Sequence, residues 1–290
     1  MVAHLLAQVR PGLDIEPVVV RTEGDRLATE PLERIGGQGV FVKEIQQAVL
    51  DRRADVAVHS AKDLPPSTPP GLTLAAIPAR GDVRDALVGS TLASLRPGAR
   101  VATGAARRRA QLANLRPDLC FVQARGNIDT RMARADGKTA DAVVIAVAAL
   151  DRLSVTSQAA EILSPTVMLP QVGQGAIALE CRADDHAVLA LLALIDHGET
   201  HRAVVAERAL LAALGASCSL PVGGWAEPDG DELHLRALVA SADGRVVLRA
   251  EGRGSDAVEL GSVVAHKLLR QSGGDGLLGW APAEEESGTR

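Results

Sequence analysis

The chain has 290 residues, enough for two or three domains that each bury a core. Its 31 lysines and arginines against 36 aspartates and glutamates give a net charge of −5, which would repel nucleic acid unless the basic residues were concentrated in one place. Tyrosine is absent, and phenylalanine and tryptophan total only two each. This composition disfavours an aromatic surface for stacking bases, so we expect no nucleic-acid partner.

The cysteines and the apolar segments indicate a compartment. Three widely spaced cysteines, with no secretory apolar region, predict a reducing environment without disulfides, and hence the cytoplasm. The longest aliphatic stretch, residues 142–150, lies between Asp141 and Asp151 and is too short to span a bilayer. We therefore expect no membrane role.

Apolar periodicity predicts a β-α-β alternation in the first part of the chain. A helix over residues 2–9 is followed by a strand at 16–22, and a glycine-rich loop at 36–39 opens the next helix. Residues 55–59 then form a buried strand that ends at Ser60. This alternation predicts parallel strands with right-handed crossovers.

The alternation continues in a second α/β unit. Strands are expected at residues 100–103, 119–123 and 142–147, with a helix over 105–115. Residues 168–175 are typical of a loop, and a strand at 176–180 follows, with helices to about Leu214.

The pattern changes in the last part of the chain. Residues 233–240 and 245–250 flank a turn at 241–244 and predict an antiparallel hairpin. A final helix lined by Leu260, Val263, Val264 and Leu268 ends near Gly273, and the polar residues 281–290 are expected to be disordered.

Three consecutive arginines lie at the start of a predicted helix. Gly104 marks a strand-to-helix turn, and residues 107–109 fall in the first helical turns. Positive side chains there oppose the helix dipole unless an anion lies between them, so the segment indicates a carboxylate or phosphate site. A solvated basic helix face is the alternative.

Further arginines favour the anion site. Arg125, Arg131 and Arg152 follow neighbouring strands. Because the carboxyl ends of parallel strands meet in one crevice, these guanidinium groups are expected to face a shared cleft.

Lys62 and Asp63 follow another buried strand, and Pro65 restricts the turn. A carboxylate among arginines should stay ionised, so Asp63 could stabilise a cation or transfer protons. An ordinary turn aspartate before a proline is the alternative. We interpret His59 as a paired strand-end residue and not as a base.

Cys218 lies in a loop of small residues, 215–224, whereas Cys120 and Cys181 lie in apolar, strand-like runs. We therefore expect Cys218 to be the accessible thiol and a candidate for covalent attachment. A small residue at a helix-to-strand corner is the alternative.

No metal-ligand spacing, Walker loop or dinucleotide fingerprint is present, which disfavours metal, nucleotide and nicotinamide chemistry.

Long motifs in one order resemble the porphobilinogen deaminase (hydroxymethylbilane synthase) family over nearly the whole chain. The matching stretches are GGQGVFVKE (36–44), ADVAVHSAKDLP (54–65), Arg107-Arg108, ARGNIDTR (124–131), LPQVGQGAIALECR (169–182), AER (206–208) and Cys218 with its glycines.

The resemblance implies an α/β fold with two periplasmic-binding-protein-like domains and a smaller C-terminal α/β domain with an antiparallel sheet. Domain one would comprise residues 1–77 and 176–196, domain two 78–175 and domain three 197–280. It also implies a monomeric, cytoplasmic transferase of tetrapyrrole and heme biosynthesis. Such an enzyme condenses four porphobilinogen molecules, with loss of ammonia, on a covalent dipyrromethane primer and then releases the linear tetrapyrrole by hydrolysis.

The resemblance also implies roles for individual residues. Cys218 matches the thioether attachment position, and Asp63 matches the catalytic carboxylate that assists loss of ammonia and stabilises the cationic intermediate. Residues that match contacts to the cofactor or to substrate acids are Ser60, Lys62, Thr103, Arg107, Arg108, Arg125, Arg131 and Arg152.

Two departures from the family pattern suggest an alternative function. The family begins with a strand and loop that carry an arginine and a serine, whereas Met1 stands at the helix after that segment. Gly104, Ala105 and Gln38 also lack side chains that are common in the pattern. An N-terminally truncated, inactive paralogue or a dicarboxylate-binding module is therefore the competing interpretation, which retention of Asp63 and Cys218 disfavours.

Overall fold

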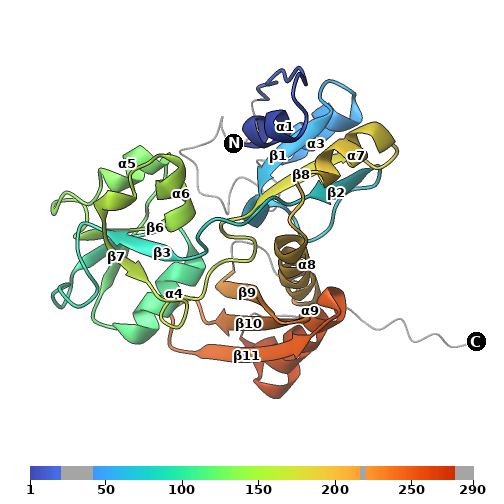
Figure 1. The fold of residues 1–290 in the computed structure, drawn as a ribbon. Coiled ribbons are helices and arrows are strands. Elements are labelled where there is room, and N and C mark those ends of the chain that lie inside the picture. Colours follow the sequence, from blue (N-terminus) through green and yellow to red (C-terminus); the bar gives the residue numbers. More distant parts are fainter. Residues whose placement is uncertain (21–41, 216–219, 278–290) are drawn as a thin grey trace, which may run out of the picture.

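A computed structural model describes residues 1–20, 42–215 and 220–277 (Figure 1). Three β-sheets, each with its own helices, surround a junction where extended segments cross. This arrangement confirms the expected α/β class and the antiparallel sheet near the C-terminus. The expectations for the loop at 36–39 and the tail at 281–290 lie outside the described residues.

The first sheet has the order β1-β8-β2. Its elements, with the helices beside it, are α1 (Val2–Val9), α3 (Lys43–Leu50), β1 (Val56–Ser60), the 3-10 turn η1 (Ala61–Asp63), β2 (Leu72–Ala76), β8 (Ile177–Arg182) and α7 (His186–Ala193). Leu6, Leu179 and Leu192 pack together between the sheet and its helices. The predicted helix at 2–9 and the strand near 55–59 are confirmed.

Three predictions for this region are wrong. The described strands pair antiparallel, because β8 returns from the second sheet and inserts between β1 and β2. Residues 16–20 form no strand: Val18 and Val19 are 51% and 88% exposed, and no described strand pairs with them. β1 is also not fully buried, since Val58 is 47% exposed and the side chains alternate between two faces.

The second sheet has the order β5-β4-β6-β3-β7. Its elements are β3 (Asp85–Val88), β4 (Arg100–Ala102), α4 (Ala106–Leu115), β5 (Cys120–Val122), α5 (Ile128–Met132), β6 (Ala142–Ala146), α6 (Val147–Arg152), η2 (Thr156–Gln158) and β7 (Ala159–Leu163). β4 pairs parallel with β5 and with β6, which confirms the predicted parallel unit. β3, which the sequence analysis did not identify, runs antiparallel to β6 and β7.

The third sheet is an antiparallel meander of β9 (Val222–Asp229), β10 (Glu232–Ala240) and β11 (Val247–Gly254). It packs against α8 (Gly198–Ala213) and α9 (Ala257–His266), which continues through η3 (Lys267–Gln271), and η4 (Gly274–Gly276) follows. The predicted hairpin is confirmed, but β9 was missed because its glycines and proline obscure the alternation of a strand. Val263 is 43% exposed, so it does not line the buried face of α9 as predicted.

Two segments, residues 77–84 and 164–176, connect the first and second sheets. They touch where Gly81 N donates to Gly175 O at 3.2 Å. Gly175 has a φ of +86°, and a Cβ there would lie 2.6 Å from Gly81 O, so the crossing requires glycine. Glu207 of α8 is fully buried beside this crossing and accepts hydrogen bonds from Arg80, Gly173 N and Ala226 N. One carboxylate therefore ties both connecting segments to the third sheet.

Candidate active site

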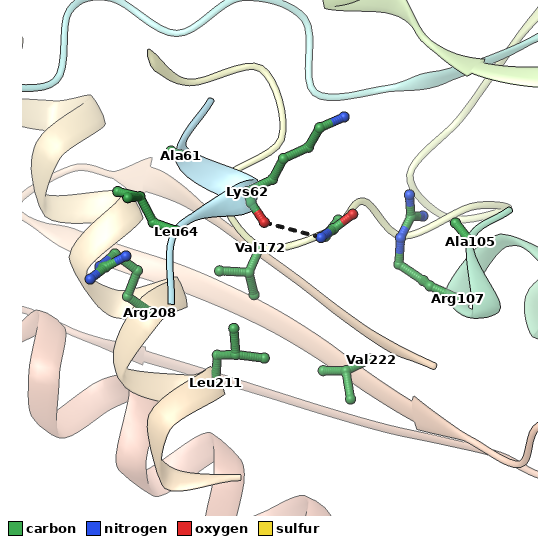
Figure 2. Close-up of a pocket in the computed structure, with 10 residues that line it drawn as sticks. Ala61, Lys62, Leu64, Ala105, Arg107, Val172, Arg208, Leu211 and Val222 are labelled. Atoms are coloured by element: carbon green, nitrogen blue, oxygen red, sulfur yellow. Dashed lines mark hydrogen bonds between the residues drawn. The ribbon is translucent and has the colours of Figure 1, made fainter. Parts of the chain in front are cut away.

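The turn that carries Lys62 and Asp63 directly follows β1. Ala61 N donates to Ala176 O at 3.0 Å, and Gln171 Nε2 donates to Lys62 O at 3.2 Å (Figure 2). Gly173 packs so closely that a Cβ there would lie 2.8 Å from Ala61 C. The second connecting segment therefore fixes the backbone of this turn.

The two side chains of the turn have different surroundings. Asp63 is exposed, and no hydrogen bond or ion pair from a described residue holds its carboxylate. Lys62 is half-buried, and burial lowers its pKa below the ordinary 10.5; the charge of Asp63 opposes this shift, and the charges of Arg108 and Arg107 add to it. The pKa of Lys62 therefore depends both on Asp63 in the same turn and on the arginines at the start of α4. Ser60, the last residue of β1, precedes the turn and pairs with Ile177.

Arg107 and Arg108 lie in the first turn of α4 and are only 3% and 7% exposed. Their side chains meet at Asp85, which belongs to the chain itself, begins β3 and is fully buried. Arg107 Nη2 donates to Asp85 Oδ2 at 2.8 Å, and Arg108 Nη2 donates to Asp85 Oδ1 at 2.7 Å. The interpretation as a solvated basic helix face is therefore wrong for Arg107 and Arg108, whereas Arg109 is exposed.

The surroundings of Asp85 strongly favour its charged form. Burial by itself would raise the pKa of Asp85, but the two guanidinium groups outweigh it and hold the pKa far below the ordinary 3.8. Gln174 Nε2 also donates to Asp85 Oδ1, at 3.0 Å. The arginine pair is thus tied to the second connecting segment.

Arg125 and Arg131 follow β5 in the second sheet, and Arg131 interacts electrostatically with Arg108, Arg125 and Asp63. Burial lowers the pKa of Arg131, the charges of Arg108 and Arg125 add to this effect, and the charge of Asp63 opposes it. Arg131 Nε donates to Gly126 O at 2.7 Å, which fixes the base of its side chain. Asp63 and these three arginines therefore share one electrostatic environment.

Two other expected site residues make hydrogen bonds to the backbone. Arg152, the last residue of α6, donates through Nη2 to Gly175 O at 3.1 Å, so it lies at the crossing of the connecting segments. Thr103 is 5% exposed, and its Oγ1 accepts from Ala105 N at 3.2 Å. This hydroxyl thus stabilises the turn that leads into α4.

A pocket lies where the three sheets meet. Figure 2 shows Lys62 above Val172, Leu211 and Val222, and Arg107 to the right of these three side chains. The lining residues are Ala61, Lys62, Leu64, Ala105, Arg107, Gln171, Val172, Arg208, Leu211 and Val222. Leu211 precedes and Val222 follows, in the sequence, the residues 216–219 that lie outside the described part of the chain.

The prediction about cysteine access is wrong for Cys120. Cys218 itself lies outside the described residues. Cys181 is buried in β8, as expected, but Cys120 is exposed because it begins the edge strand β5. An apolar run in the sequence does not distinguish a central strand from an edge strand, so the pattern could not reveal this difference.

His59 is 5% exposed, with its Nε2 3.3 Å from Glu180 Oε2. Glu180 is fully buried and also accepts from Gln46 Nε2 at 2.8 Å. On the C-terminal side of the turn, Arg208 Nη2 donates to Pro66 O at 3.0 Å. These contacts fix the chain before and after Lys62 and Asp63.

Sequence reasoning missed Asp85, Gln171, Gln174 and Arg208. Asp85 and Gln174 meet only through the crossing of the connecting segments, and no local pattern marks that contact. Gln171, Gln174 and Arg208 fall within the family motifs, which were the only available signal.

Over residues 1–20, 42–215 and 220–277 there is no group of three or more His, Cys, Asp or Glu that could hold a metal. The helices of that same part of the chain are too short or too polar to cross a membrane.

Comparisons with known proteins agree on one family. The family model "Porphobilinogen deaminase, dipyromethane cofactor binding domain" matches residues 1–190, and the model of the C-terminal domain of porphobilinogen deaminase matches residues 201–270. Porphobilinogen deaminase of Roseiflexus sp. (strain RS-1) is 48% identical over 94% of this chain and 91% of its own length. The protein of the same name from Roseiflexus castenholzii (strain DSM 13941 / HLO8) is 46% identical over 96% of this chain and 93% of its own length.

Solved structures similar to this chain include two periplasmic binding proteins. The arginine-specific protein STM4351 of Salmonella typhimurium has a TM-score of 0.30 and 17% identity over 52% of this chain and 68% of its own. The His/Glu/Gln/Arg/opine family-binding protein of Silicibacter pomeroyi has a TM-score of 0.32 and 14% identity over 67% of this chain and 76% of its own.

Proposed function

This chain belongs to the porphobilinogen deaminase family, and we propose that Asp63 and the arginines across the cleft carry out its reaction. The reaction is that of hydroxymethylbilane synthase, in which porphobilinogen molecules are joined head to tail. At each condensation the C–N bond of the aminomethyl group breaks, ammonia leaves, a C–C bond forms to the free α-carbon of the chain end, and that carbon loses its proton. Water completes the final release.

The observation that carries the residue assignment is the surplus of positive charge around one acid. Among the described residues, Lys62, Arg107, Arg108, Arg125 and Arg131 form one group of interacting charges with two carboxylates, Asp63 and Asp85. Each pyrrole of the substrate carries an acetate and a propionate. Guanidinium groups bind such acids through paired N–H donors, so an overall acidic chain can hold an acidic substrate here.

Asp63 suits the reacting carbon because its carboxylate is exposed while the carboxylate of Asp85 is already paired. A negative charge there stabilises the positive charge that develops on the pyrrole as ammonia leaves. The same carboxylate then accepts the ring proton after the new bond has formed. Lys62 and Ser60 border this position and bind carboxylates of the cofactor or the substrate.

The dipyrromethane cofactor of the family fits the donor set of this cleft. Arg107, Arg108, Arg125, Lys62, Ser60 and Thr103 would hold its acidic side chains, and Cys218 would hold it through a thioether. Arg131 and Arg152 would bind substrate acids. When bound, the cofactor supplies the free pyrrole α-carbon at which the product chain grows.

We further propose three domains: residues 1–77 with 176–196, residues 78–175, and residues 197–280. Support comes from β8, which pairs with β1 and β2 although its sequence follows the whole second sheet. We also propose that the protein is a cytoplasmic monomer. The net charge of −5 and the scarcity of aromatic residues support the further proposal that it has no nucleic-acid partner.

Intact-protein mass tests the attachment site. We expect the mass of a dipyrromethane on the parent protein and none on Cys218→Ser, because serine supplies no thiolate. Cys120→Ser is the matched control, since that thiol is exposed but lies on the edge strand β5. It should carry the full added mass. An unmodified parent, or an adduct that survives in Cys218→Ser, would refute the assignment.

A further inference from the structure

Asp85 lies at the same edge of the second sheet as the arginines, although it starts a strand. β3 runs antiparallel to β6, and Asp85 pairs with Ala146, the last residue of β6. The beginning of β3 is therefore placed beside the carboxyl end of a parallel strand, where α4 also begins. This register puts a buried carboxylate directly under Arg107 and Arg108.

The hydrogen bonds leave part of each guanidinium available. An arginine has five N–H donors. Arg107 uses one donor on Asp85 and one on Leu169 O at 2.5 Å. Arg108 uses two on Asp85 and one on Val144 O at 3.1 Å. Three donors of Arg107 and two of Arg108 thus stay outside these contacts, and Arg107 Nε is a buried donor with no partner among the described residues.

Charge explains why the pair needs Asp85. Arg107 and Arg108 are adjacent and almost fully buried, so without a counter-ion each would raise the free energy of the other. One shared carboxylate offsets this repulsion and sets the rotation of both guanidinium planes. Gln174, which also donates to Val83 O at 2.6 Å, fixes that carboxylate in turn.

We propose that Asp85 is the positioning residue for the carboxylate-binding arginines: it holds Arg107 and Arg108 so that their remaining donors bind the acidic side chains of the cofactor and the growing product. This inference rests on the proposed function. Asp85 itself contacts no ligand, because its oxygens are occupied by Arg107, Arg108 and Gln174. Its contribution is to keep two cations oriented before an acid arrives.

The test measures cofactor loading in place of turnover. Protein made without porphobilinogen is incubated with increasing porphobilinogen, and intact mass gives the fraction loaded. In Asp85→Asn the arginines lose their counter-ion, so half-maximal loading should require at least tenfold more porphobilinogen. The loaded variant should show a raised KM with a smaller change in kcat, because the defect lies in holding carboxylates.

A second variant and a control separate positioning from folding. Asp85→Glu keeps the negative charge but moves the carboxylate by one methylene, and it should load with a similar shift even if Asp85→Asn does not fold. Arg182→Gln removes another buried charge, which pairs with Asp55 and Asp185 at the end of β8 away from the turn, and should lower thermal stability without shifting the loading midpoint. If the folded Asp85 variants reach half-maximal loading at the same porphobilinogen concentration as the wild type, the inference about Asp85 is wrong, and the proposed function is unaffected. A parent protein that never loads would overturn the proposed function and the inference with it.

Discussion

The two sides of the cleft hold their charged groups in opposite ways. On the side of the first sheet, Asp63 stands exposed on a three-residue turn, and contacts to the backbone fix the turn itself. On the side of the second sheet, Arg107 and Arg108 are buried and bound to Asp85 through their side chains. Under the proposed roles, the arginines that would hold carboxylates are fixed by the protein itself, whereas the acid that would react is left open to substrate.

The largest effect should follow removal of the open acid. Asp63→Asn should lower turnover by roughly two to four orders of magnitude, the range for loss of a positioned proton-transfer group. Thermal stability should hardly change, because no described residue pairs with this carboxylate. Steady-state assays with porphobilinogen and a thermal melt measure both. Near-normal turnover would remove Asp63 from the mechanism, and a large loss of stability would contradict the contrast between the two sides.

The next largest effect concerns Glu207, which joins both connecting segments to the third sheet. Glu207→Gln leaves Arg80 buried without its counter-ion, which should lower the free energy of unfolding by about 3–5 kcal/mol. Denaturant unfolding measures the change. Asp118→Asn, which breaks the more exposed pair with Arg116, is the control and should have a much smaller effect. Equal losses in the two variants would mean that the junction contributes no more than a surface pair.

The smallest effect concerns Lys62, whose pKa depends on charges from both sides of the cleft. Because its pKa is lowered, Lys62 loses its charge below pH 10.5, so the KM for porphobilinogen should rise by roughly tenfold as pH increases through that lowered value. Over the same window the unfolded chain binds more protons than the folded chain, so the free energy of unfolding should increase with pH. The two trends therefore have opposite signs.

Lys62→Arg is the matched variant, because arginine stays charged through this range. Its KM and its stability should lose the pH dependence that the lysine causes. The chain contains no tyrosine, which leaves fewer groups that titrate in alkali. A wild-type KM that stays flat to pH 10.5, or a variant with an unchanged profile, would show that Lys62 does not hold carboxylates.

Local patterns in the sequence determined the helices, the parallel unit of the second sheet and the residue types of the site. Apolar spacing predicted α1, which buries one face, and an apolar run predicted β6, which is buried along its whole length. The run of arginines at the start of α4 predicted an anion, and the motifs predicted Asp63 and the family. These inferences depend on residues that are close together in the chain.

Only the tertiary structure decided which anion the arginines meet and which strands pair. Asp85 reaches Arg107 because β3 runs antiparallel within an otherwise parallel edge, and β8 inserts between β1 and β2 after more than a hundred intervening residues. The exposure of Cys120 likewise depends on β5 lying at the edge of its sheet. Strand order and direction are set by packing between distant segments, so a periodic pattern within one segment carries no record of them.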